Sequence, residues 1–201
     1  MQYGLYYNKE KLGDILFIVF NSNTNPNKVI KKDHCTILYK DEKIVGINIF
    51  NISSIIKIKA KGFIPYINMD ILNCINSILI NEGVEKLPYQ DSSGFTVAQI
   101  VEIDEHPDSD HLHVLSVFNG KDTLQIVCGA SNVKVGMKVV LANLYAFMPS
   151  GQQILPAKLL GIESYGMLCS GRELNLDGYE NKKGLLELDD SYDVGEDFWR
   201  K

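Results

Sequence analysis

The chain has 201 residues, of which 45% are hydrophobic and 22% are charged, and its formal net charge is −5. This balance excludes an intrinsically disordered chain, and no apolar run approaches the roughly 20 residues that a membrane-spanning helix needs. The first residues lack the basic-then-apolar order of a secretory signal, so we expect a soluble, cytoplasmic protein that makes no membrane contact and has two modest cores.

The charge is distributed unevenly along the chain. Residues 1–92 contain 11 Lys and Arg against 9 Asp and Glu, which gives +2, whereas residues 93–201 contain 9 against 16, which gives −7. An acidic region repels a phosphate backbone at long range, so nucleic-acid binding there requires a local basic patch. The lysines between Lys28 and Lys61 are more typical of a solvated face than of a phosphate-binding patch.

The first half predicts an α+β domain. Leu12–Phe20 is a short apolar run that predicts a buried strand, and Cys35–Lys40 and Lys43–Phe50 have the spacing of a β-hairpin. Apolar residues after Asn68 and Asp70 recur at helical spacing, and Asn68 or Asp70 is a suitable N-cap. Gly83 follows the pattern and fits its C-terminal stop.

The stretch LPYQDSSG, residues 87–94, has the composition of a linker. We therefore expect a domain boundary near Ser92, with one domain at residues 1–92 and another at residues 93–201. We see no sequence signal for the role of the first domain.

The second half contains frequent short strands with no long helix between them, which favours an all-β barrel. Asn119–Asp122 is a strong hairpin signal between two of the strands. The predicted strands are Thr96–Asp104, Leu112–Phe118, Thr123–Val127, Lys138–Ala142, Gln152–Leu160, Gly166–Cys169 and Leu185–Leu188.

Two patterns could carry chemistry, and neither is complete. His106, His111 and His113 lie close together, but they lack cysteine partners at zinc-ligand spacing, and no HExxH pattern is present. Cys128 could act as a nucleophile with one of these histidines as its base, although its alternation with apolar residues predicts a buried and inert thiol. We therefore expect no catalytic residue, no metal site and no cofactor.

The remaining candidates lie in or beside turns of the strand-rich region. Lys158, Ser164, Ser170 and Arg172 can bring polar side chains together on one rim, although ordinary solvated turns explain them equally well. The four cysteines have no CxxC spacing and are more typical of buried thiols than of a disulfide framework.

From the HPDSD run onward the chain resembles the tRNA-binding OB-fold domain of the EMAP II and Trbp family, also found near the start of the bacterial phenylalanyl-tRNA synthetase beta subunit. The resemblance is carried by QIVCGASNV, VGMKVVLA and AKLLGIESYGMLCSGREL in this order, and it covers roughly residues 95–199. The chain as a whole resembles the free-standing bacterial YtpR-type proteins.

The resemblance implies an OB-fold barrel that binds tRNA without catalysis. The positions of this chain that match the family's motif are Asn132, Lys158, Ser164, Met167, Ser170 and Arg172. Leu160 stands where many family members carry arginine. The resemblance also implies that the module can form a homodimer. Two other hypotheses for the function are a protein-interaction module of the translation machinery and, least favoured, a histidine-based metal-dependent hydrolase.

Overall fold

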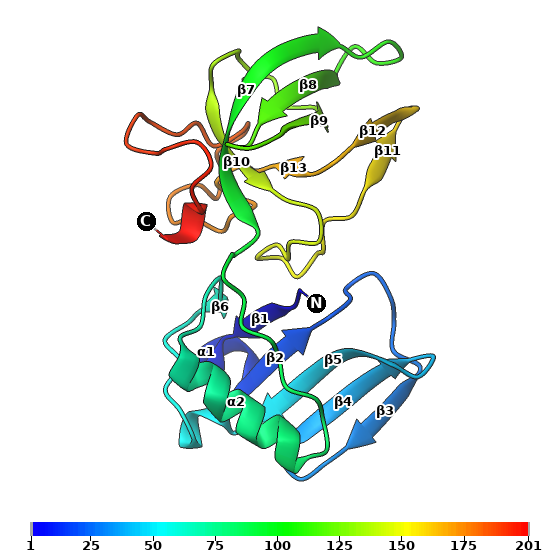
Figure 1. Ribbon diagram of the computed structural model, residues 1–201, viewed down its shortest axis with the longest axis vertical. Helices are drawn as coiled ribbons and strands as arrows, with labels where there is room; N and C mark the ends of the chain where they lie inside the picture. The colour runs from blue at the N-terminus through cyan, green and yellow to red at the C-terminus, as the bar shows by residue number, and fades with distance from the viewer. Residues whose placement is uncertain (1, 201) are drawn as a thin grey trace. The chain divides into compact units, whose positions relative to one another are not determined.

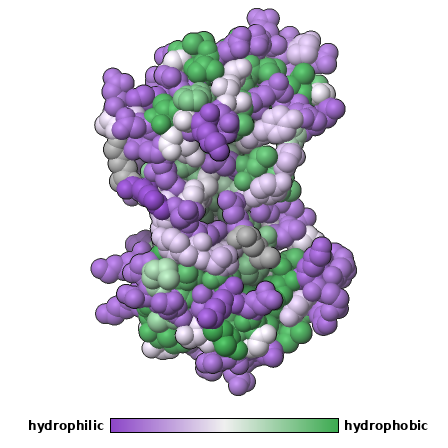
Figure 2. Space-filling view, viewed as in Figure 1, coloured by the Kyte–Doolittle hydropathy of each residue, from purple (hydrophilic) through white to green (hydrophobic). Residues whose placement is uncertain are grey.

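The computed structural model describes residues 2–200, and the chain divides into two compact units (Figure 1). The first unit reaches Asp91, and the second runs from Ser92 onward, apart from residues 150–153. The first unit combines a sheet with helices, and the second is a nearly closed antiparallel barrel. The predicted fold class, α+β followed by an all-β OB-fold barrel, is therefore confirmed. Figure 2 shows hydrophilic residues over much of the visible surface of each unit, with hydrophobic groups between them.

The first unit contains a six-stranded antiparallel sheet in the order β3-β4-β5-β2-β1-β6. Its strands are β1 Gly4–Tyr7, β2 Ile15–Val19, β3 Lys28–Lys31, β4 Cys35–Lys40, β5 Lys43–Phe50 and β6 Gly62–Phe63. Within the predicted strand Leu12–Phe20, Ile15–Val19 forms β2 with alternate side chains buried, whereas Leu12 is exposed at the end of a helix. The predicted hairpin is formed by β4 and β5. Asp41 and Glu42 join them with φ of 46° and 66°, so this two-residue turn has left-handed backbone without the usual glycine. The sequence patterns missed β1, β3 and β6.

Helix α2, Met69–Asn81, has the predicted caps at both ends. The side chain of Asn68 accepts a hydrogen bond from a backbone N–H of the first turn. At the other end Gly83 has a φ of 75°, and the N–H of Val84 donates to the carbonyl of Leu79. This is a Schellman end, in which glycine supplies the left-handed backbone.

The core of the first unit lies between the sheet and α2, which covers one face of it (Figure 1). The fully buried side chains at this contact include Leu16, Ile18, Ile47, Ile49, Ile75 and Leu79. The other helices of residues 2–200 are short: α1 Lys9–Leu12 and η1 Ile52–Ser54 in the first unit, and η2 Phe198–Arg200 in the second.

The second unit is built on a five-stranded antiparallel sheet in the order β13-β10-β7-β8-β9. Its strands are β7 Phe95–Glu105, β8 His113–Phe118, β9 Thr123–Cys128, β10 Lys138–Ala142 and β13 Met167–Leu168. The register between β7 and β8 shifts at Val101, and such a bulge bends a long strand around a barrel. The interior is filled by side chains that are at most 1% exposed: Ala98, Ile100, Leu115, Val117, Ile126, Val139 and Leu141.

A separate ladder of β11, Ala157–Leu159, and β12, Ile162–Ser164, helps to close the barrel. The side-chain amide of Gln125 on β9 donates to the carbonyl of Glu163 at 2.7 Å, and the N–H of Tyr165 donates to the carbonyl of Gln125 at 3.0 Å. The end of β12 therefore lies beside β9, while β13 pairs with β10.

Two predicted strands of the second half are corrected. In Gln152–Leu160 only the last part forms a strand, because Pro156 offers no N–H to a ladder and Ile154 bonds instead to the carbonyl of Ala146. Leu185–Leu188 forms no strand. The N–H of Leu186 donates to the carbonyl of Cys169, just after β13, and the N–H of Leu188 donates to the carbonyl of Lys138 on β10, so the segment crosses between strands instead of pairing along one.

Within residues 2–200, no helix combines the length and the apolar character that crossing a membrane requires. All four cysteines are free thiols, and Cys35, Cys128 and Cys169 are buried.

Candidate nucleic-acid interface

A depression of about 420 Å³ opens in the second unit where the end of β9, strand β13 and two loops meet. Two basic side chains line it, Arg172 and Lys183, together with the polar residues Ser131, Ser170 and Glu173. Met167 and the backbone of the Cys128–Ala130 turn supply much of the remaining wall. The depression therefore combines cations, hydroxyl groups and an apolar wall, which are the groups that contact nucleic-acid backbones and bases.

Two cations of this depression, Arg172 and Lys183, stand against one carboxylate, that of Glu173. Glu173 forms a capping box with Ser170: its carboxylate accepts from the N–H and hydroxyl of Ser170 at 2.8 and 2.6 Å, and its own N–H donates to that hydroxyl. Arg172 and Lys183 are exposed, and neither forms an ion pair within the part of the chain that the structure describes. The depression therefore has one positive charge in excess, and both cations can contact an anion at its rim.

Asn132 lies beneath the same rim and holds its backbone in place. Its side-chain amide donates to the carbonyl of Leu185 at 3.0 Å and accepts from the N–H of Leu185 at 2.8 Å. The neighbouring Gly184 has a φ of 86°, and a Cβ there would lie 2.6 Å from the Asn132 Oδ1. A residue with a side chain at position 184 would clash with Asn132 and strain the backbone, so only glycine fits there.

Ser164 is almost fully buried, and its hydroxyl is used within the protein. It accepts from the N–H of Val127 at 3.1 Å and donates to the carbonyl of Gly166 at 3.2 Å. These bonds tie the end of β12 to β9. Ser164 therefore fixes the position of the β11–β12 hairpin relative to β9.

Lys158 is exposed on β11, opposite Glu163 on β12. The turn between the strands consists of Leu160 and Gly161, with φ of 42° and 91°, and the Leu160 side chain is 58% exposed at its tip. The Glu163 carboxylate accepts a hydrogen bond from the hydroxyl of Tyr165, which leaves the Lys158 ammonium without an ion pair among residues 2–200.

His106 anchors this hairpin to the turn after β7. Its Nδ1 accepts the N–H of Asp108 at 3.1 Å, so the proton lies on Nε2, which donates to the carbonyl of Leu159 at 3.1 Å. Both ring nitrogens are therefore occupied, and His106 positions the strand that carries Lys158.

The structure gathers some of the residues predicted from the sequence and separates others. Met167, Ser170 and Arg172 line the depression, Asn132 supports its edge, and Lys158 and Ser164 belong to the β11–β12 hairpin. Sequence reasoning missed Lys183 as a partner of Arg172. The run NKKG at 181–184 was the available signal, because two lysines before a glycine turn present basic side chains together.

The structure offers little support for Cys128 as a nucleophile or for a metal site at the histidines. Burial raises the pKa of the Cys128 thiol, and the N–H of Ala130 lies 3.5 Å from its sulfur. His113 stands opposite Cys128 in the ladder, but no hydrogen bond joins their side chains among the described residues. Over residues 2–200, no group of three or more His, Cys, Asp and Glu is arranged to hold a metal ion.

Comparison with known proteins identifies the family of this chain. Residues 95–197 match the family described as "Putative tRNA binding domain". Over 197 residues the chain is 40% identical to the "Putative tRNA-binding protein YtpR" of Bacillus subtilis (strain 168), covering 96% of this chain and 98% of that protein. The chain belongs to the YtpR-like family. Residues 22–87 of this YtpR-like chain match a second family, described as "Domain of unknown function (DUF4479)".

The second unit of this YtpR-like protein is shared with much larger proteins. It is 48% identical over 107 residues to the phenylalanine–tRNA ligase beta subunit of Ehrlichia canis (strain Jake), which covers 52% of this chain and 14% of that subunit. A crystal structure titled as the C-terminal domain of Plasmodium vivax p43 is similar with a TM-score of 0.37 and 23% identity, covering 51% of this chain and 56% of that one.

Proposed function

We propose that this YtpR-like protein is a non-catalytic tRNA-binding protein that recognises folded RNA by shape and backbone contacts through its barrel. The observation that supports it most is the depression lined by Arg172 and Lys183, which form no ion pair with any residue from 2 to 200 and lie within the region that matches the tRNA-binding family. A tRNA-binding protein works where tRNA is found, so the proposal includes a cytoplasmic location.

The predicted RNA-binding residues divide into three roles in this proposal. Lys158 and Arg172, joined by Lys183, contact phosphates, because long cationic side chains supply the sequence-independent part of RNA affinity. Asn132, Ser164 and Ser170 hold the backbone on which these cations stand, and Met167 supplies apolar wall for a sugar or an exposed base.

The binding should be weak and should discriminate little between tRNAs. Three phosphate contacts give a dependence of log K on log salt with a slope of about −3, since each contact contributes about −0.9. The net charge of −7 on residues 93–201 opposes RNA at long range. Phosphate contacts also carry no direct sequence information.

The test is a titration of the full chain with tRNA at several salt concentrations. The double variant Arg172→Gln, Lys183→Gln should flatten the salt slope by about two units. A matched control is Lys121→Gln, Lys134→Gln, because both lysines are exposed in the same unit and neither lines the depression. An equal loss in the control would refute the assignment of the site, and so would an unchanged slope in the double variant.

The acidic charge of the second unit favours one alternative, a protein-interaction module that contacts a basic partner of the translation machinery. Absence of tRNA binding at low salt would select this alternative. The homodimer implied by the family resemblance belongs to the proposal too, and sedimentation of the pure protein measures it directly.

A further inference from the structure

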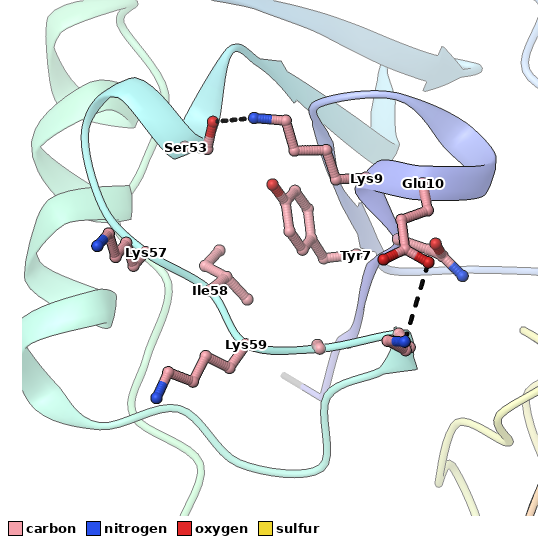
Figure 3. Close-up of a pocket in the computed structure, with 10 residues that line it drawn as sticks. Tyr7, Lys9, Glu10, Ser53, Lys57, Ile58 and Lys59 are labelled. Carbon is pink, nitrogen blue, oxygen red and sulfur yellow. Dashed lines mark hydrogen bonds and ion pairs between the residues drawn. The ribbon is translucent and has the colours of Figure 1, made fainter.

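The first unit has a basic depression of its own, of about 680 Å³ (Figure 3). We call its four lysines, Lys9, Lys57, Lys59 and Lys61, the lysine cluster. Ile58, Ala60 and Tyr7 supply the apolar part of its lining. Its lining residues 53–61 lie in the region described as a domain of unknown function, residues 7–10 precede that region, and none of them belongs to the proposed tRNA site.

The local sequence explains why the lysines stand together. Residues 56–60 belong to no helix or strand, and their exposure alternates, with Ile56, Ile58 and Ala60 half-buried and Lys57 and Lys59 exposed. Ile58 is half-buried and points toward Tyr7, whereas Lys57 and Lys59 are exposed and point away from it on the other side of the segment (Figure 3). Alternate residues of an extended chain are about 7 Å apart. Lys57 and Lys59 therefore form a short row of charges.

Most of this positive charge is left uncompensated. Residues 43–69 contain four lysines and no aspartate or glutamate. Lys61 lies 3.9 Å from the Glu10 carboxylate, but both side chains are more than three-quarters exposed, and such pairs contribute little. Lys57 and Lys59 form no ion pair within the described chain.

The acidic group behind the depression is already satisfied by neutral donors. The Asp14 carboxylate accepts from the hydroxyl of Tyr7 at 2.9 Å and from the N–H and hydroxyl of Ser53 at 3.1 and 2.6 Å. Lys9 donates to the Ser53 hydroxyl at 2.7 Å and lies 3.8 Å from Asp14. Four lysines against Glu10 and Asp14 leave two positive charges in excess.

We propose that the lysine cluster is a second RNA-contacting surface, which binds consecutive phosphates of a strand. The arrangement favours a strand over a single small anion, because a single anion needs donors that converge on one point, and Lys57 and Lys59 stand side by side instead. Ile56, Ile58 and Ala60 pack against the core of the first unit, and this packing holds the segment that carries the row. This inference goes beyond the proposed function, because it concerns the first unit and is tested separately.

The test is a nuclear magnetic resonance titration of the ¹⁵N-labelled full chain with an oligouridylate RNA at low salt. Amide signals of Lys9 and residues 56–62 should shift and saturate. The variant Lys57→Gln, Lys59→Gln should lose these shifts or weaken the binding at least about fivefold, and its salt slope should fall by about 1.4, since each contact with a single strand contributes about 0.7.

The matched control is Lys31→Gln, Lys43→Gln, which removes two exposed lysines of the same unit that do not line the depression. It should change the affinity less than twofold. An equal loss in this control, or oligouridylate that produces no shift at residues 56–62, would overturn the proposal.

A parallel titration with uridine monophosphate separates the two sources of phosphate. The lysine cluster should bind the nucleotide at least tenfold more weakly than the strand. Equal affinities would indicate that the ligand is a free nucleotide and would overturn the inference. Signals of Arg172 and Lys183 in the same spectra report on the barrel site, so failure of one surface is distinguished from failure of the other.

Discussion

Replacing Asn132 by alanine should destabilise the second unit while affecting RNA binding only indirectly. The side chain forms two hydrogen bonds to the backbone of the buried residue Leu185, at 2.8 and 3.0 Å. Each such bond contributes about 1 kcal/mol, so the expected loss in the free energy of unfolding is about 2 kcal/mol. For a unit of this size that corresponds to a fall in the melting temperature of roughly 8–16 °C.

The chain contains a single tryptophan, Trp199, and it lies in the second unit, so its fluorescence in a urea titration follows this unit selectively. Asn181→Ala is the matched control, because Asn181 is exposed in the neighbouring loop. Its urea midpoint should match that of the wild type. If Asn132→Ala keeps the wild-type midpoint but loses affinity for tRNA, the clamp is not the role of this side chain, and direct contact with RNA takes its place.

Three further predictions follow from the two units. Cutting the chain at Ser92 should leave a C-terminal fragment that folds alone, because the barrel supplies its own core; a fragment without a cooperative thermal transition would contradict the domain assignment. The hydrogen bond from Ser53 lowers the pKa of Asp14 in the folded state, so its stabilising contribution is present above the ordinary value of 3.8 and is lost as the pH falls through the lower folded value. Asp14→Asn should therefore reduce the acid dependence of unfolding of the first unit, and an unchanged profile would exclude this role. The protein should be isolated without stoichiometric zinc, as measured by elemental analysis; one tightly held zinc per chain that is lost on replacing His111 and His113 would reverse this expectation.

The elements that the sequence determined by itself depend on interactions between residues close together in the chain. Helix α2 was predicted with both ends because its caps, Asn68 and Gly83, act within one turn of it. The β4–β5 hairpin followed from the two apolar runs on either side of Asp41 and Glu42. Strand β1 was missed because its four residues are too few for an alternating pattern, and its pairing with β2 defines it.

The use of each polar side chain was decided only by the tertiary structure. Sequence order places Asn132 and Ser164 in the motif, but their hydrogen bonds reach Leu185 and Val127, 53 and 37 residues away. Lys183 joins Arg172, and Lys9 joins the 57–61 row, for the same reason: packing brings together segments that no local pattern relates. The period of side chains along the backbone and the caps at its ends determine a helix or strand locally. Whether a charged or hydroxyl side chain is hydrogen-bonded inside the protein or left to bind a ligand is decided only when distant segments of the chain pack together.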